Sequence, residues 1–215
     1  MNDLEQNGIN FLNKIDYLAK RKDLKTKDSL FKVLDHIRLR DGYHLGLKLA
    51  NSVGMGDESW FYCYEGNIDP GKDADSTAHP HATLPLALQL FKGLKVQHTV
   101  MGAWQSYLLH VSQSMLPLFW HGGYGRREYF FDRESYKGTV IPIHAEKAVI
   151  LPIEKIPHPE VMIEEDKAIV SCPYWNDWEG LVLESVPITF KKDGKITFGR
   201  EKHKVLKKFN CGICF

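Results

Sequence analysis

The sequence has few of the features that would assign it to a specialised class of protein. Its four cysteines in 215 residues are too few for a disulfide-stapled scaffold and fit a reducing compartment. No apolar run approaches the ~20 residues that cross a bilayer. The first residues also lack the basic and apolar segments of a signal peptide. We therefore expect a cytoplasmic protein with no membrane association.

An excess of charge of one sign is also missing. The chain has 28 Lys and Arg against 27 Asp and Glu, a formal net charge of +1, so it has no global field that would attract nucleic acid. A basic run at 191–208 has few interleaved aromatic residues, with only Phe198 inside it and Phe190 and Phe209 beside it, so it is a weak match to a nucleic-acid surface. This run is interpreted as solvated strand and loop faces, and we expect no nucleic-acid partner.

What the chain does have is enough apolar material for a sizeable core. Hydrophobic residues make up 43% and aromatic residues 12%, as in a globular protein. No linker, repeat or low-complexity tract divides the helix-rich part (1–120) from the strand-rich part (126–210). We therefore predict a single α+β domain over residues 1–215.

Helical periodicity dominates the first part of the chain. Apolar residues recur at helical spacing over 3–20, after a capping residue at Asn2 or Asp3, and again over 29–39. A short helix is predicted after Thr83, with Pro85 in its first turn. A longer helix is predicted from Thr99 to Pro117, with one apolar stripe.

Strand patterns frame and follow these helices. Residues 43–50 and 59–65 read as a hairpin. Strand-like runs are 127–132, 139–144, 147–153, 161–164, 167–172, 181–190, 195–199 and 203–209. Turns are predicted at 166–167 and 192–195. The fold class that follows is α+β, with N-terminal and central helices packed on a largely antiparallel sheet or half-barrel, and a strand-rich C-terminal half.

The first candidate ligand-binding segment is the loop 120–127. Three of its residues are glycines, which free the backbone to present amides to an anion. Arg126 and Arg127 could add a bidentate clamp for carboxylate or phosphate. The aromatic and imidazole members of this site are Trp120, His121 and Tyr124. The alternative is a wide turn with solvated arginines.

A second aromatic loop spans 173–180. Trp175 and Trp178, if exposed, would form a platform for a sugar, a base or a partner chain. If buried, they would instead cover one end of the sheet.

Histidines and cysteines suggest a metal site as the alternative. His79 and His81 lie two residues apart, so both rings could reach one zinc ion, with His121 as third ligand. Cys211 and Cys214 have metal-ribbon spacing but no second pair. Cys63 lies in an apolar run and is expected to be buried and inert.

Two function classes follow. The first is a domain that binds a small anionic or polar ligand, or a protein partner, through loops 120–127 and 173–180. The second is a metal-assisted hydrolase at His79, His81 and His121, with zinc as cofactor and Glu65 or Asp75 as general base. No recognisable set of nucleophile, acid and base stands out, so the binding domain is favoured and enzymatic activity stays open.

Overall fold

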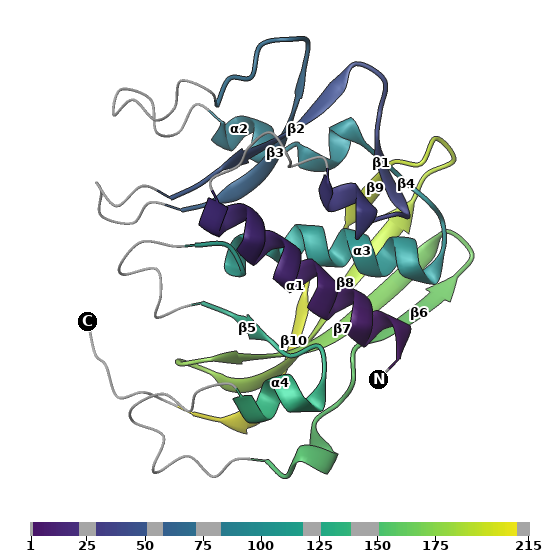
Figure 1. Ribbon diagram of the computed structural model, residues 1–215. Coiled ribbons are helices and arrows are strands. Elements are labelled where there is room, and N and C mark those ends of the chain that lie inside the picture. Colours follow the sequence, from purple (N-terminus) through teal and green to yellow (C-terminus); the bar gives the residue numbers. More distant parts are fainter. Residues whose placement is uncertain are drawn as a thin grey trace.

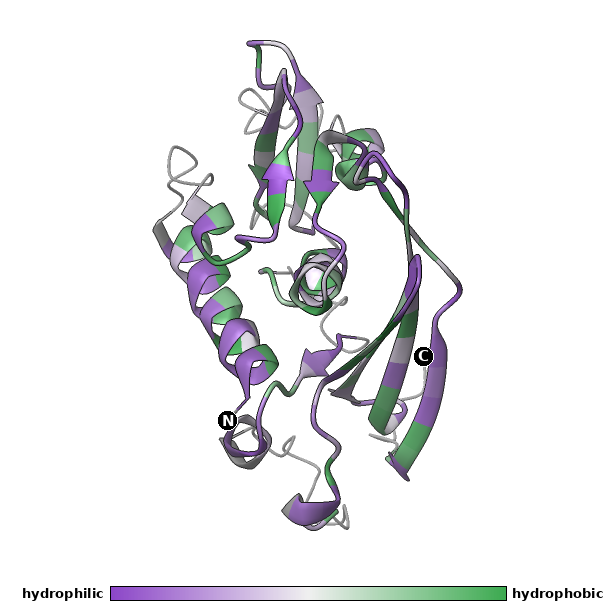
Figure 2. Ribbon diagram, turned by 90° about the vertical axis from the view of Figure 1, so that its right-hand side faces the viewer, coloured by the Kyte–Doolittle hydropathy of each residue, from purple (hydrophilic) through white to green (hydrophobic). Residues whose placement is uncertain are grey.

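The central helix α3 (Val100–Val111) is the element around which the others are arranged. The computed structural model describes residues 2–21, 29–50, 58–71, 83–117, 126–138 and 151–209. Figure 2 shows α3 end-on, between helix α1 (Asp3–Arg21), a hairpin and the larger sheet. Most of its residues are buried, Trp104 and Tyr107 completely. A helix that is apolar on most sides needs such enclosure. Thr99 caps it by accepting a hydrogen bond from the Gly102 amide at 2.9 Å, and the helix begins where it was predicted.

Helix α1 covers one side of α3 and confirms the predicted helix over 3–20. Asn2 and Glu5 form a reciprocal capping box, in which each side chain accepts the other residue's backbone N–H, at 2.9 and 2.7 Å. Phe11, Ile15 and Leu18 are buried against the core, as their spacing predicted.

The larger sheet covers the opposite side of α3 (Figure 1). Its strands are β5 (Glu128–Tyr129), β6 (Glu160–Glu164), β7 (Lys167–Asn176), β8 (Gly180–Phe190), β9 (Ile196–Phe198) and β10 (Lys202–Lys208). The strand order is β10-β8-β7-β5, with β6 paired to β7 and β9 to β8, and all these pairs are antiparallel. Both predicted turns exist, with positive φ at Glu165 (46°) and Gly194 (76°).

Two smaller sheets and several short helices complete the described part of the chain. The predicted hairpin is formed by β2 (Tyr43–Lys48) and β3 (Trp60–Glu65), and the other pair is β1 (Ile37–Leu39) with β4 (Leu94–Val96). The short helices are α2 (Leu84–Ala87), η2 (Leu90–Gly93), η3 (Ser112–Ser114), α4 (Arg133–Gly138) and η6 (Ile153–Lys155). The helix expected after Thr83 is therefore present.

The helix predicted over 29–39 is wrong beyond its first turn. Residues 29–32 form a short 3-10 turn, and residues 37–39 pair with β4 as a strand. The buried side chain of Gln105 accepts a hydrogen bond from the His36 amide at 2.8 Å and donates to Asp35 at 2.7 Å. These tertiary contacts outweigh a modest helical propensity.

The remaining strand predictions have mixed outcomes. Residues 151–155 form a coil and η6 rather than the end of a strand at 147–153, and the helix α4 was not predicted. The run at 139–144 lies outside the described residues. The α+β class with a strand-rich C-terminal half is confirmed. No helix in the described ranges has the length and apolar character needed to cross a bilayer.

One apolar core joins the two parts of the chain. It contains Phe11 and Trp104 from the helices, Phe61 from the hairpin, and Val170 and Val186 from the larger sheet. Single-domain organisation stays a prediction, and we expect one cooperative unfolding transition. Limited proteolysis tests it: a stable fragment beginning near residue 125 would contradict it.

Candidate functional site

A buried carboxylate lies on the face of the larger sheet that packs against α3. Glu184, on β8, is 0% exposed, and it shares its face of the sheet with the buried apolar residues Val182 and Val186. Tyr107 on α3 donates a hydrogen bond to its Oε1 at 2.7 Å, and Tyr129 on β5 donates to the same atom at 3.1 Å. Burying a carboxylate is unfavourable unless it is paired and hydrogen-bonded.

Arg127 supplies the opposite charge and joins Glu184 to a second carboxylate. One guanidinium nitrogen donates to Glu184 Oε2 at 2.7 Å, and another donates to Glu201 Oε2 at 3.1 Å. The guanidinium also lies over the ring of Tyr174, 5.2 Å from its centroid. Arg127 is therefore committed to three partners from the larger sheet and its connections.

Two histidines extend the network to the surface. His203 Nε2 lies 3.1 Å from Glu201 Oε2 and 3.7 Å from Glu184 Oε2. His110, in the last turn of α3, faces Glu201 Oε1 at 3.6 Å and stacks on Phe198 with ring centroids 4.1 Å apart. We call Glu184, Arg127, Glu201, His203 and His110 the charged network.

The environment shifts the pKa values of this network in opposite directions. Burial raises the pKa of Glu184, although Tyr107 and Arg127 oppose this shift. Partial burial acts the same way on Glu201, but Arg127, His203 and His110 outweigh it and lower its pKa. Burial lowers the pKa of His110 despite the nearby Glu201. His110 is therefore neutral, and Glu201 ionised, at neutral pH.

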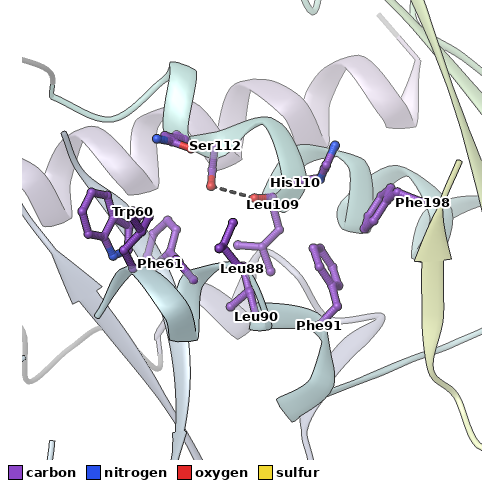
Figure 3. Close-up of a pocket in the computed structure, with 12 residues that line it drawn as sticks. Trp60, Phe61, Leu88, Leu90, Phe91, Leu109, His110, Ser112 and Phe198 are labelled. Carbon is purple, nitrogen blue, oxygen red and sulfur yellow. Dashed lines mark hydrogen bonds between the residues drawn. The ribbon is translucent and has the colours of Figure 1, made fainter. Parts of the chain in front are cut away.

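A pocket of about 300 Å³ adjoins this network at His110. It lies between α2–η2 and the end of α3, with Trp60 and Phe61 towards one end and Phe91 and Phe198 towards the other (Figure 3). Its lining residues are Trp60, Phe61, Leu84, Ala87, Leu88, Leu90, Phe91, Leu109, His110, Ser112, Gln113 and Phe198. A mostly apolar cavity with a few polar groups is typical of small-molecule sites.

Most of the residues predicted for the site fall outside the described part of the chain. Trp120, His121 and Tyr124 of the first loop do so, as do His79 and His81 and the pair Cys211 and Cys214. Their roles in ligand or zinc binding stay predictions. Cys63 is buried, as expected, and burial raises the pKa of its thiol to about 12, which is consistent with an inert cysteine.

The predicted arginines have different surroundings. Arg126 Nε donates to the Ser114 carbonyl, in the turn after α3. Arg127 enters the charged network instead of facing solvent. The Arg127 guanidinium, which was predicted to bind an anionic ligand, therefore pairs with two carboxylates of the protein itself.

The second loop is shorter than predicted, because residues 173–176 belong to β7 and pair with β8. Trp175 therefore lies on this strand, and Trp178 lies in the turn before β8. Trp175 packs on Phe209 at 5.1 Å between ring centroids, and its indole N–H donates to Asp177 at 3.0 Å. Trp178 is 52% exposed. Trp175 is therefore partly buried at the sheet end, whereas Trp178 has the exposure that a platform requires.

The two carboxylates that pair with Arg127 form, together with His203, a group with metal-ligand spacing. Within the described ranges, one group of this kind is found: Glu184, Glu201 and His203, with ligand atoms within 4.8 Å of one another. Zinc accepts carboxylate and imidazole ligands. However, the Arg127 guanidinium already contacts both carboxylates, so an added cation would compete with it.

Comparison with protein-family models, with curated proteins and with solved structures gives no match. The function of this site has to be argued from its geometry.

His110 gives a first test of the network. Because its pKa is lowered in the folded protein, the unfolded chain binds a proton more readily. The free energy of unfolding therefore falls as pH drops below the ordinary histidine value of about 6.5. We expect His110→Gln to lose less stability between pH 7.5 and 5.5 than the wild type, in urea titrations. His44→Gln, at an exposed position, is the control. Equal losses in the wild type and His110→Gln would contradict the prediction.

Proposed function

We propose that this protein is a ligand-binding domain, and that its ligand is a small molecule whose apolar body occupies the pocket between α2–η2 and α3. The observation that carries this proposal is the position of the pocket. Its mostly apolar lining includes His110, the member of the charged network that faces Glu201. Such convergence of an apolar cavity with groups of perturbed pKa favours a binding site.

Described residues at the ends of the two aromatic segments predicted from the sequence join the charged network or lie beside it. Arg127 closes loop 120–127 and joins the network that reaches His110. Tyr174, near the end of β7, lies under the Arg127 guanidinium. We propose that Trp178, exposed in the turn between β7 and β8, adds contacts to a bound ligand or a protein partner.

A direct test uses 2-phenylethanol, a neutral probe with an aromatic body and one polar group. The indole N–H of Trp60, buried at one end of the pocket, provides the NMR signal, assigned with Trp60→Phe. We expect this signal to shift with a Kd on the order of millimolar, as for a weak fragment. Ala87→Phe, which fills the pocket, should abolish the shift.

The matched control for that variant is Val100→Phe. Val100 is exposed at the first turn of α3, about 15 Å along the helix from His110. It should keep the probe affinity of the wild type. If Ala87→Phe binds the probe as well as Val100→Phe does, the pocket is not the site.

A metal-assisted hydrolase is the second candidate, and the spacing of Glu184, Glu201 and His203 favours it. In that case these three residues would hold zinc. They would do so either alone or together with His79, His81 and His121. Metal analysis of protein purified without an affinity tag distinguishes the candidates. One zinc per chain, lost in His203→Ala, would support the hydrolase, whereas substoichiometric metal would favour the ligand-binding domain.

A further inference from the structure

Residues 84–89 form a segment that borders the pocket and is anchored at both ends. Thr83, before it, is 0% exposed and accepts a hydrogen bond from the Trp60 indole N–H at 3.0 Å. Leu90, after it, is 7% exposed. Between these two anchors every residue is exposed or half-buried. We call residues 84–89, which contain α2 and lead into η2, the strap.

The strap is apolar, which makes its exposure unusual. Apart from Gln89 it consists of leucine, proline and alanine. None of its residues is buried, and the exposed fractions of Leu84 and Leu88 are 37% and 82%. Single exposed leucines are common on protein surfaces, whereas a contiguous exposed apolar segment marks a surface that becomes covered.

The hydrogen bonds of the strap are local. The Ala87 amide donates to the Thr83 carbonyl, the Leu88 amide to the Leu84 carbonyl, and the Gln89 amide to the Leu86 carbonyl. Within the described part of the chain, no hydrogen bond joins the strap to residues outside 83–92. The strap can therefore move between its anchors without breaking a hydrogen bond to the rest of the described structure.

The pocket lies against this strap. Leu84, Ala87 and Leu88 line it together with Leu109 and His110 of α3. In Figure 3, Leu88 lies between the Trp60 end and the Phe198 end of the pocket. If the strap closed over an empty cavity, the enclosed void would leave the lining side chains without contact atoms. A ligand that fills the cavity removes this cost and so favours the closed position.

We infer that the strap is a lid, which closes over a bound ligand and buries Leu88 against it. This inference rests on the proposed function, because the lid needs an occupant in the pocket. Gln89, between α2 and η2, has φ −115° and ψ 15°, outside the helical region. Residues at the ends of elements absorb the backbone changes of lid closure. Thr83 and Leu90, which are buried, keep the two ends in place.

The exposure of the Leu88 methyl groups tests closure directly. A soluble gadolinium chelate broadens the methyl signals of exposed side chains, and it is added to the full chain with and without saturating 2-phenylethanol. Without the probe, Leu88 should be broadened at least as strongly as Met162, which is 51% exposed on β6. With the probe, Leu88 should be broadened no more than the half-buried Leu86, whereas Met162 should not change. The Trp60 indole signal reports saturation.

The variant Leu88→Ser tests whether closure contributes to affinity. It should weaken 2-phenylethanol several-fold, because the closed strap then has one large apolar side chain fewer to bury. Urea unfolding of the free variant should match the wild type, since Leu88 is exposed there. Met162→Ser, the matched control, should bind the probe as the wild type does.

Two results would overturn the lid while the pocket stands. One is unchanged broadening of Leu88 when 2-phenylethanol saturates the Trp60 signal, and the other is wild-type affinity in Leu88→Ser. If 2-phenylethanol does not shift the Trp60 signal at all, the proposed pocket function fails, and the lid fails with it.

Discussion

Replacing Glu184 with alanine is expected to lower the free energy of unfolding by about 3–5 kcal/mol, the usual effect of breaking a buried ion pair. The variant leaves Arg127, which is only 26% exposed, with Glu201 as its remaining carboxylate. It also leaves the buried hydroxyls of Tyr107 and Tyr129 without their acceptor, and each unsatisfied group adds a desolvation penalty. Urea unfolding at pH 7.5 measures the loss.

The control for this prediction is Glu160→Ala, at an exposed position on β6, which should change stability by less than about 0.5 kcal/mol. The double variant Arg127→Met with Glu184→Met separates charge from packing. Replacing both partners by apolar residues is often close to neutral, so the double variant should be more stable than Glu184→Ala. A loss below about 1 kcal/mol for Glu184→Ala would mean that the carboxylate has no stabilising role.

The sequence pattern already indicates that Glu184 is buried, although the strand prediction for this segment did not draw that conclusion. The run 181–190 was correctly predicted as a strand, and alternation places Glu184 on the same face as Val182 and Val186. A carboxylate at an apolar position of a half-buried strand marks a functional or specifying group. What the pattern could not supply is its partners, since Tyr107 and Arg127 lie 77 and 57 residues away in the chain.

The helices and hairpins with strong periodicity were predictable, and the pocket was not. Helices α1 and α3 and the β2–β3 hairpin follow from spacing and capping residues alone. The pocket is assembled from short segments near 60, 84–91, 109–113 and 198. None of these segments has a motif of its own, and only the tertiary arrangement brings them together. The loops were predicted as sites because their composition is unusual, but composition does not indicate which residues lie close together in the fold.

Gly46→Ala is expected to destabilise the protein by about 3 kcal/mol, at the upper end for overpacking a core. Gly46 on β2 pairs directly with Tyr62 on β3. A Cβ atom at position 46 would lie 2.1 Å from Cε2 and Cζ of the Tyr62 ring. That ring is 1% exposed, and its hydroxyl donates to Asp69 at 2.6 Å. The ring can therefore move only by giving up this hydrogen bond and its packing.

The background variant Tyr62→Leu tests this cause. In that background the clash is removed, so adding Gly46→Ala should cost less than about 1 kcal/mol, a non-additivity that a double-mutant cycle measures. The ligand pocket offers a second readout, because Trp60 and Phe61 on the same strand line it. Gly46→Ala should shift the Trp60 indole signal and weaken 2-phenylethanol, since displacement of β3 moves that wall of the pocket. Equal costs of Gly46→Ala in both backgrounds would show that the close contact with Tyr62 is not the reason for a glycine at this position.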